Sequence, residues 1–219
     1  MPISRRERPA KPALTRAGII ATAVEVLRAE GLEKVTMRRL AQELDTGAAS
    51  LYVYVRNTAE LHAAVLDELL GEVDLTGTGD WRARLTGILE SYTAVLFRNP
   101  SLARSALVSW PTGEHFLAVI EALLAALDDG LVPAEQAAWG VDLLLLHATA
   151  TAVEHTTREE SLAGDDEWEA MSTAVRGVSP ERFPHLASLG TEMLSGPGGG
   201  RMAWGFDVLI NGILHTPLP

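Results

Sequence analysis

Histidines and carboxylates are the residues of this chain that could carry out acid–base or metal chemistry. The sequence has six histidines and 29 acidic residues but no cysteine, which excludes thiolate catalysis and disulfides. His147, Glu154 and His155 form the best-spaced group. However, residues eight apart on a helix lie about 12 Å apart along its axis, too far to share one metal ion. HExxH, GxSxG and glycine-rich phosphate motifs are also missing. We therefore predict no catalytic residue, no metal, no cofactor and no enzymatic activity.

A second group of basic, hydroxyl-bearing and small residues lies in and just after the stretch TMRRLAQELDTGAASLYVYVR, residues 36–56. Arginine and hydroxyl groups bind phosphate oxygens, whereas small or methyl-bearing side chains allow close approach to base edges and thymine methyls. This combination is the chemistry of a DNA contact. The candidate DNA-binding residues are Thr36, Arg38, Arg39, Ala48, Ala49, Ser50, Tyr52, Val53, Tyr54, Arg56 and Thr58.

Two short helices joined by a tight corner would position these residues. Thr36 is a suitable N-cap for the first helix. The segment 45–47, Asp-Thr-Gly, breaks the helical pattern because Asp tolerates a left-handed backbone and Gly is sterically unrestricted. A second helix from Ala48 to about Val55 would bury Leu51 and Val55. This is the outline of a helix-turn-helix that enters the major groove, and the alternative is a helical hairpin of some other α-protein.

The residues TMRRLAQEL and SLYVYVRNTAEL closely resemble the DNA-binding domain of the TetR family of transcriptional regulators. The resemblance is strongest over residues 14–74. It is weaker but continuous beyond them, where WGFDVLINGIL resembles the carboxy-terminal domain of the tetracycline-repressor branch. It implies a homodimeric, ligand-responsive repressor that a small molecule releases from double-stranded operator DNA.

The same resemblance implies a ligand cavity walled by the fifth to eighth helices. It also implies a four-helix dimer interface made from the long eighth helix and the last helix of each subunit. Tetracycline sensors carry a histidine near the end of the fourth helix, where this sequence has Asp74. The resemblance therefore does not support a metal–tetracycline ligand, and the effector remains an unknown small molecule.

Charge is distributed unevenly along the chain. Residues 1–60 hold ten basic and seven acidic residues, a net charge of +3, and residues 61–219 hold eight basic and twenty-two acidic residues, a net charge of −14. Basic residues at one end suit a contact with phosphates, and the acidic remainder limits indiscriminate DNA binding. The acidic part also favours, weakly, a cationic or neutral ligand over an anion.

Three segments are expected. Residues 1–13 form a disordered basic arm that either reaches the DNA backbone or minor groove or remains a solvated tail. Residues 14–60 form the helix-turn-helix domain, and residues 61–219 form the ligand-binding and dimerisation domain. With no secretory segment and no apolar run long enough to span a membrane, we expect a cytoplasmic protein.

The pattern is all-α throughout: a three-helix DNA-binding domain followed by a larger helical domain. Predicted boundaries include caps at Asn57, Asp80 and Thr112, a break at 99–100, and a long helix from Pro133 to about Thr157. The acidic segment 158–184 is predicted to be a mobile connection that contains a weak amphipathic helix with Trp168, Met171 and Val175. A short helix over 185–195, a glycine hinge at 196–200 and an apolar final helix are predicted after it.

Two sets of residues are candidates within the larger domain. Large aromatic side chains with one polar partner favour a ligand pocket, although each is individually more common as core. The pocket candidates are Trp81, Tyr92, Trp110, Phe116, Trp139 and His147, and the dimer-interface candidates are Ala148, Ala152, Phe206, Leu209, Gly212 and Ile213. The alternative function is a helical interaction or small-molecule-binding protein that does not bind DNA, which a gel-shift with the upstream DNA would distinguish.

Overall fold

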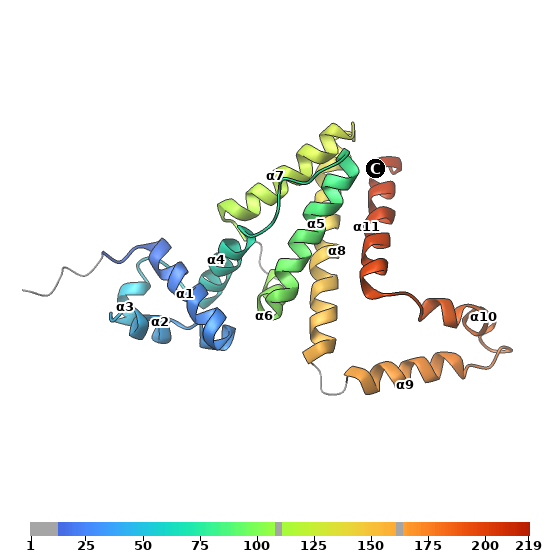
Figure 1. Ribbon diagram of the computed structural model, residues 1–219, viewed down its shortest axis with the longest axis horizontal. Helices are drawn as coiled ribbons and strands as arrows, with labels where there is room; N and C mark the ends of the chain where they lie inside the picture. The colour runs from blue at the N-terminus through green and yellow to red at the C-terminus, as the bar shows by residue number, and fades with distance from the viewer. Residues whose placement is uncertain (1–12, 108–110, 161–163) are drawn as a thin grey trace, which may run out of the picture. The chain divides into compact units, whose positions relative to one another are not determined.

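The computed structural model describes residues 13–107, 111–160 and 164–219, and these residues contain helices and no strand. The chain divides into two compact units, one ending at Val65 and the other beginning at Leu66. The boundary falls inside helix α4 (Thr58–Leu70), so one continuous helix contributes residues to both units. The all-α prediction is therefore confirmed (Figure 1).

The first unit contains α1 (Arg16–Glu30), a 3₁₀ turn (Leu32–Lys34), α2 (Met37–Glu43), α3 (Ala48–Leu51) and the first turns of α4. The predicted N-cap at Thr36 is confirmed, because its hydroxyl accepts from Arg39 N. The hydroxyl of Thr15 caps α1 in the same way and accepts from Gly18 N. The predicted end of α3 at about Val55 is wrong, because the helix stops after Leu51. The 3₁₀ turn was not predicted.

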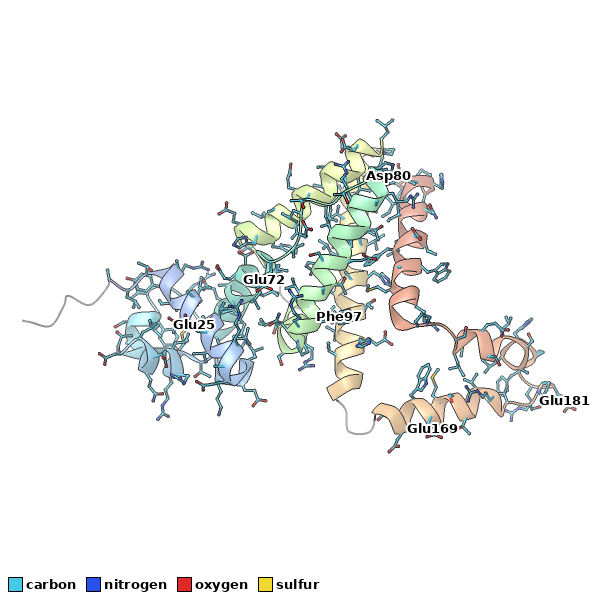
Figure 2. The ribbon with its side chains drawn as sticks, viewed as in Figure 1. Glu25, Glu72, Asp80, Phe97, Glu169 and Glu181 are labelled. Atoms are coloured by element: carbon cyan, nitrogen blue, oxygen red, sulfur yellow. The ribbon has the colours of Figure 1, made fainter. Side chains whose placement is uncertain are left out.

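The second unit is built around the long helix α8 (Ala134–Glu160). Its main packing partners are α5 (Trp81–Arg98), α6 (Pro100–Ala106), α7 (Glu114–Asp129) and α11 (Gly198–His215). Figure 2 shows Phe97 on α5 beside α8, where its ring meets the ring of His155 at a centroid distance of 5.1 Å. The helices α9 (Gly164–Arg176) and α10 (Pro184–Met193) connect α8 to α11 and pack on each other.

Two predicted boundaries in this unit are wrong. Helix α7 begins after Gly113 rather than at a Thr112 cap, and the carboxylate of Asp67 accepts a hydrogen bond from Phe116 N at 3.0 Å in its first turn. The amphipathic helix predicted with Trp168, Met171 and Val175 is present as α9, which buries Val175. The glycines at 198–200 form the first turn of α11 instead of a hinge, because propagation of an established helix tolerates residues of poor propensity.

Helices α8 and α11 run antiparallel and approach closely at glycines. Gln136 near the start of α8 donates to the backbone carbonyl of Thr216 at 2.7 Å, while His147 further along α8 lies against Gly205. A Cβ atom built on the buried Gly140 would lie only 2.8 Å from Cδ1 of Ile213. The absence of a side chain at Gly140 therefore sets the spacing of the two helices.

Substitution Gly140→Ala should lower the free energy of unfolding by about 1–2 kcal/mol. Overpacking against the branched Ile213 costs about 1–3 kcal/mol, and the better helix propensity of Ala returns up to about 1 kcal/mol. Gly87→Ala on α5 is the matched control, because its added Cβ meets nothing within 4 Å. Urea denaturation of both variants measures the effect, and equal stabilisation of the two would contradict this packing.

Candidate DNA-binding surface and ligand pocket

The helical corner formed by α2 and α3 is built on fully buried apolar residues. Leu40, Leu51 and Val55 are each 0% exposed and hold the two short helices together. Asp45 adopts φ of 47°, the left-handed conformation predicted for the corner. The amide of Thr46 then donates to the carbonyl of Ala41 at 2.8 Å and closes the turn. A helix-turn-helix thus lies where the sequence placed it.

The outer face of this corner is small, hydroxyl-bearing and unusually exposed. Val53 is 81% exposed and Tyr52 52% exposed, although an apolar side chain of a small unit is more often covered. The structure also places Thr36, Arg38, Ala49, Ser50 and Tyr54 on the exposed surface, with Ala48 half-buried. Exposed apolar and aromatic residues on one unit, together with an exposed arginine, offer a surface to a partner.

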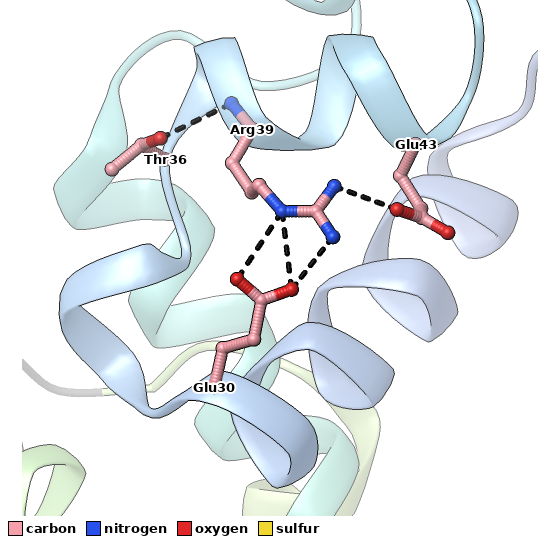
Figure 3. Close-up of polar contacts among 4 residues, drawn as sticks. All are labelled: Glu30, Thr36, Arg39 and Glu43. Atoms are coloured by element: carbon pink, nitrogen blue, oxygen red, sulfur yellow. Dashed lines mark hydrogen bonds and ion pairs between the residues drawn. The ribbon is translucent and has the colours of Figure 1, made fainter.

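Arg39 is the exception among the predicted contact residues. Its guanidinium forms ion pairs with Glu30 on α1 and Glu43 on α2, each with an N–O distance of 2.6 Å (Figure 3). The hydrogen bond from Arg39 lowers the pKa of Glu30. Arg39 therefore joins α1 to α2 within the chain, and its guanidinium is less available for a phosphate contact than that of the exposed Arg38.

The start of α4 is held by the predicted cap at Asn57 together with Glu60. The side-chain oxygen of Asn57 accepts from Glu60 N at 2.8 Å, and the Glu60 carboxylate reaches back to Arg56. It accepts from both the backbone N and the Nε of Arg56 at 2.9 Å, and these hydrogen bonds lower the pKa of Glu60. Arg56 and Thr58 remain exposed at this helix start.

A pocket of about 180 Å³ lies in the second unit between α5, α6, α7 and α8. It is lined by Tyr92, Ala106, Leu107, Pro111, Phe116, Asp142, Leu145, Leu146 and Thr149. The hydroxyls of Tyr92 and Thr149 hydrogen-bond at 2.9 Å across the helices. Burial raises the pKa of Tyr92, so its phenol is neutral and can donate or accept. The pocket wall is mostly apolar and contains a few polar groups, which is the usual lining of a small-molecule binding site.

Two of the six predicted pocket residues, Tyr92 and Phe116, lie in its wall. Trp110 lies outside the described residues, between Leu107 and Pro111. Trp81 packs its ring against Gly130 instead, and Trp139 is 61% exposed on α8. The four α8 wall residues were missed, although their spacing of i, i+3, i+4 and i+7 marks one helix face: Asp142, Leu145, Leu146 and Thr149.

His147 is also absent from the pocket wall. Its ring meets Phe206 of α11 edge to face at a centroid distance of 5.3 Å, and its buried Nε2 faces Gly205 without a hydrogen bond to any described residue. His147 lies on the α11-facing side of α8, about half a helix turn away from Thr149. Its assignment as a ligand contact is therefore corrected to a packing residue between α8 and α11.

Most of the predicted dimer residues are buried within the single chain. Ala148, Ala152 and Phe206 are 0% exposed and Ile213 is 7% exposed, so these four offer no surface to a second subunit. Leu209 is half-buried, whereas Gly212 is exposed. Instead, the outward faces of the two helices carry the exposed apolar residues Trp139, Leu143 and Leu146 on α8 and Trp204 and Val208 on α11.

No group of three or more His, Asp or Glu residues suited to a metal ion occurs in the part of the chain that the structure describes. Within the same residues, no helix is both long and apolar enough to cross a membrane.

Two family models match the chain. "Bacterial regulatory proteins, tetR family" matches residues 19–65, which contain the helical corner. "Tetracyclin repressor-like, C-terminal domain" matches residues 74–216, which contain the pocket.

Individual relatives cover nearly the whole chain. The HTH-type transcriptional repressor DrrR1 of Streptomyces coeruleorubidus is 30% identical over 95% of this chain and 80% of that protein. The crystal structure of SCO7704 from Streptomyces, classed as a transcription regulator, is 56% identical with a TM-score of 0.82, covering 95% of this chain and 98% of that one. ActR, a TetR family protein of Streptomyces coelicolor solved with actinorhodin, is 33% identical with a TM-score of 0.81, covering 93% of this chain and 96% of that one.

Proposed function

Because the chain belongs to the TetR family of bacterial regulatory proteins, we propose that it is a homodimeric repressor released from its operator by a small molecule. The observation that carries the proposal is the exposed surface of the α2–α3 corner, where Val53 is 81% exposed and Arg38, Tyr52 and Tyr54 are exposed as well. The pocket among α5 to α8 supports the ligand-responsive part. Operator DNA as the target implies that the protein acts in the cytoplasm.

The corner offers one set of residues for contacts with phosphates and another for contacts with bases. Arg38, Tyr52 and Tyr54 would bind phosphate oxygens and fix the position of α3, without reading sequence. Ala49, Ser50 and Val53 would approach base edges and thymine methyl groups in the major groove. Arg56 and Thr58, at the start of α4, would add a phosphate contact, weakened by the ion pair of Arg56 with Glu60.

The dimer would form through the outward faces of α8 and α11. Arg201, Trp204, Val208, Gly212 and His215 follow at intervals of three or four residues and share one face of α11. Trp139, Leu143, Leu146 and Ala150 do the same on α8. The two helices are antiparallel, and their exposed apolar faces are adjacent. A twofold axis would bring them against the same two helices of a second subunit and give a four-helix interface.

A ligand would release the DNA by binding better to a dimer geometry that does not fit the operator. Helix α4 would transmit this preference, because it runs from Thr58 beside the corner to Leu70 in the unit that contains the pocket. A coupling of about 1–3 kcal/mol corresponds to roughly a 5- to 150-fold loss of operator affinity.

The test is a titration of the protein with its own upstream DNA at several salt concentrations, using Arg38→Ala and Arg39→Ala as a pair. Arg38→Ala should weaken binding to specific and nonspecific DNA alike and reduce the salt slope by about one, since one phosphate contact is lost. Arg39→Ala should keep the salt slope and lower the unfolding temperature, because it breaks the pairs with Glu30 and Glu43.

An unchanged salt slope in Arg38→Ala would remove that residue from the DNA interface. If the unmodified protein shows no binding to upstream DNA, the alternative of a helical protein that binds no DNA is correct.

A further inference from the structure

The charge of the pocket wall is the feature that the proposed function leaves unexplained. Of the nine described residues that line the pocket, one is charged, and that residue is Asp142. The others are apolar except Tyr92 and Thr149, whose hydroxyls are hydrogen-bonded to each other. No lysine, arginine or histidine lies among these described wall residues. Among the described wall residues, a ligand in the pocket therefore meets one negative group and no positive one.

Asp142 faces outward, in a position to contact a ligand rather than to stabilise the fold. It lies on α8 one turn before Leu146 and two turns before Thr149, so it borders the pocket on the same helix face. Its side chain is exposed, and no hydrogen bond or ion pair joins it to another described residue. The carboxylate is free to accept a ligand group at the rim while apolar walls cover the rest of the molecule.

Ligand classes differ in how they would meet this wall. An anionic group would lie near a carboxylate without a cationic partner, which is unfavourable. A neutral polar group would find the Tyr92 and Thr149 hydroxyls at the inner end. A protonated amine would find Asp142 as its counter-ion, with its apolar body against Phe116, Leu145 and Leu146.

We propose that the effector of this regulator is a molecule with an apolar, ring-containing body and a protonated amine, and that Asp142 selects it by pairing with the amine. This inference rests on the proposed function, since it identifies the class of ligand for the same pocket. The carboxylate is solvent-exposed, so the pair contributes selectivity more than affinity, and the apolar wall provides most of the binding.

The experiment uses three probes that share one ring system and differ in the charge of the end group. 1-Naphthylmethylamine is cationic at pH 7, 1-naphthylmethanol is neutral and 1-naphthylacetic acid is anionic. Binding of each to the full-length protein is measured by calorimetry at millimolar concentrations. The amine should bind roughly two- to fivefold tighter than the alcohol, the range expected for an exposed ion pair, and the acid should bind weakest.

The variant Asp142→Asn should bring the ratio of amine to alcohol affinity close to one while leaving the alcohol affinity almost unchanged. The matched control is Asp128→Asn, an exposed position on α7 outside the pocket wall. It removes the same charge from the same unit and should keep the wild-type ratio. The control separates a local pair from the general attraction of an acidic domain for cations.

Three results would overturn the proposal. The first is a ratio of amine to alcohol affinity that is the same in Asp142→Asn as in the wild type. The second is a change of oligomeric state in Asp142→Asn on sedimentation, which would place the carboxylate in the subunit interface. The third is binding of none of the probes by a protein that still binds its upstream DNA, which would refute this pocket as the effector site and leave the DNA-binding function standing. Failure of the DNA titration itself would instead refute the proposed function.

Discussion

Gly212→Arg should convert the protein from a dimer to a monomer and lower operator affinity by roughly 10²- to 10⁴-fold. Two linked binding units gain that much over one, because the second binding event is intramolecular. Gly212 lies on the outward face of α11 with Trp204 and Val208, which are 69% and 48% exposed in the single chain. An arginine there would have to lose its hydration inside an apolar interface.

The fold of the single chain should tolerate this change. A Cβ atom added to Gly212 meets nothing within 4 Å. Sedimentation measures the oligomeric state, and a DNA titration measures the affinity. Ala125→Arg, at an exposed position of α7, is the control for an added arginine and should remain dimeric. A wild-type protein that sediments as a monomer at micromolar concentration would refute the proposed dimer.

Val53→Glu should cost about 2–3 kcal/mol of DNA-binding free energy, a loss of roughly 30- to 150-fold. Val53 is 81% exposed directly after α3, where the proposed interface faces the bases. A carboxylate there would approach phosphates and base acceptors, and like-charge juxtaposition in an interface costs several kcal/mol. The fold should be unaffected, because an exposed Val contributes little burial.

Leu117→Glu on α7 is the control for Val53→Glu. Leu117 is 57% exposed and lies in the second unit, so the variant has the same net charge as Val53→Glu but an unchanged corner. Fluorescence anisotropy with labelled upstream DNA compares the two variants. Equal affinities would show that total charge, rather than contact at Val53, governs binding.

Local signals in the sequence predicted the caps and the corner of the DNA-binding unit. Caps at Thr36 and Asn57 and the left-handed Asp45 depend on residues one to three positions away, so composition and spacing predict them. The same reasoning failed at the end of α3. The pattern predicted a helix to about Val55, but the helix ends at Leu51.

The role of Arg39 was not predictable in this way. Its partner Glu30 is nine residues away on another helix, so only the packing of α1 against α2 decides that this arginine is occupied while its neighbour Arg38 is exposed. Tertiary structure therefore gives two adjacent arginines of the same chemical type different surroundings.

In the larger unit, the sequence by itself determined that helices exist and that they carry apolar stripes. Only the tertiary structure decided which stripe faces which neighbour. Helix α8 is apolar on several sides, and its periodicity is the same whether a side faces α5, α11 or a second subunit. His147 and Thr149 are two residues apart, yet one packs on α11 and the other hydrogen-bonds to Tyr92 in the pocket. The physical reason is that burial is non-directional and rewards any apolar contact, so the choice among neighbours depends on the whole arrangement of helices.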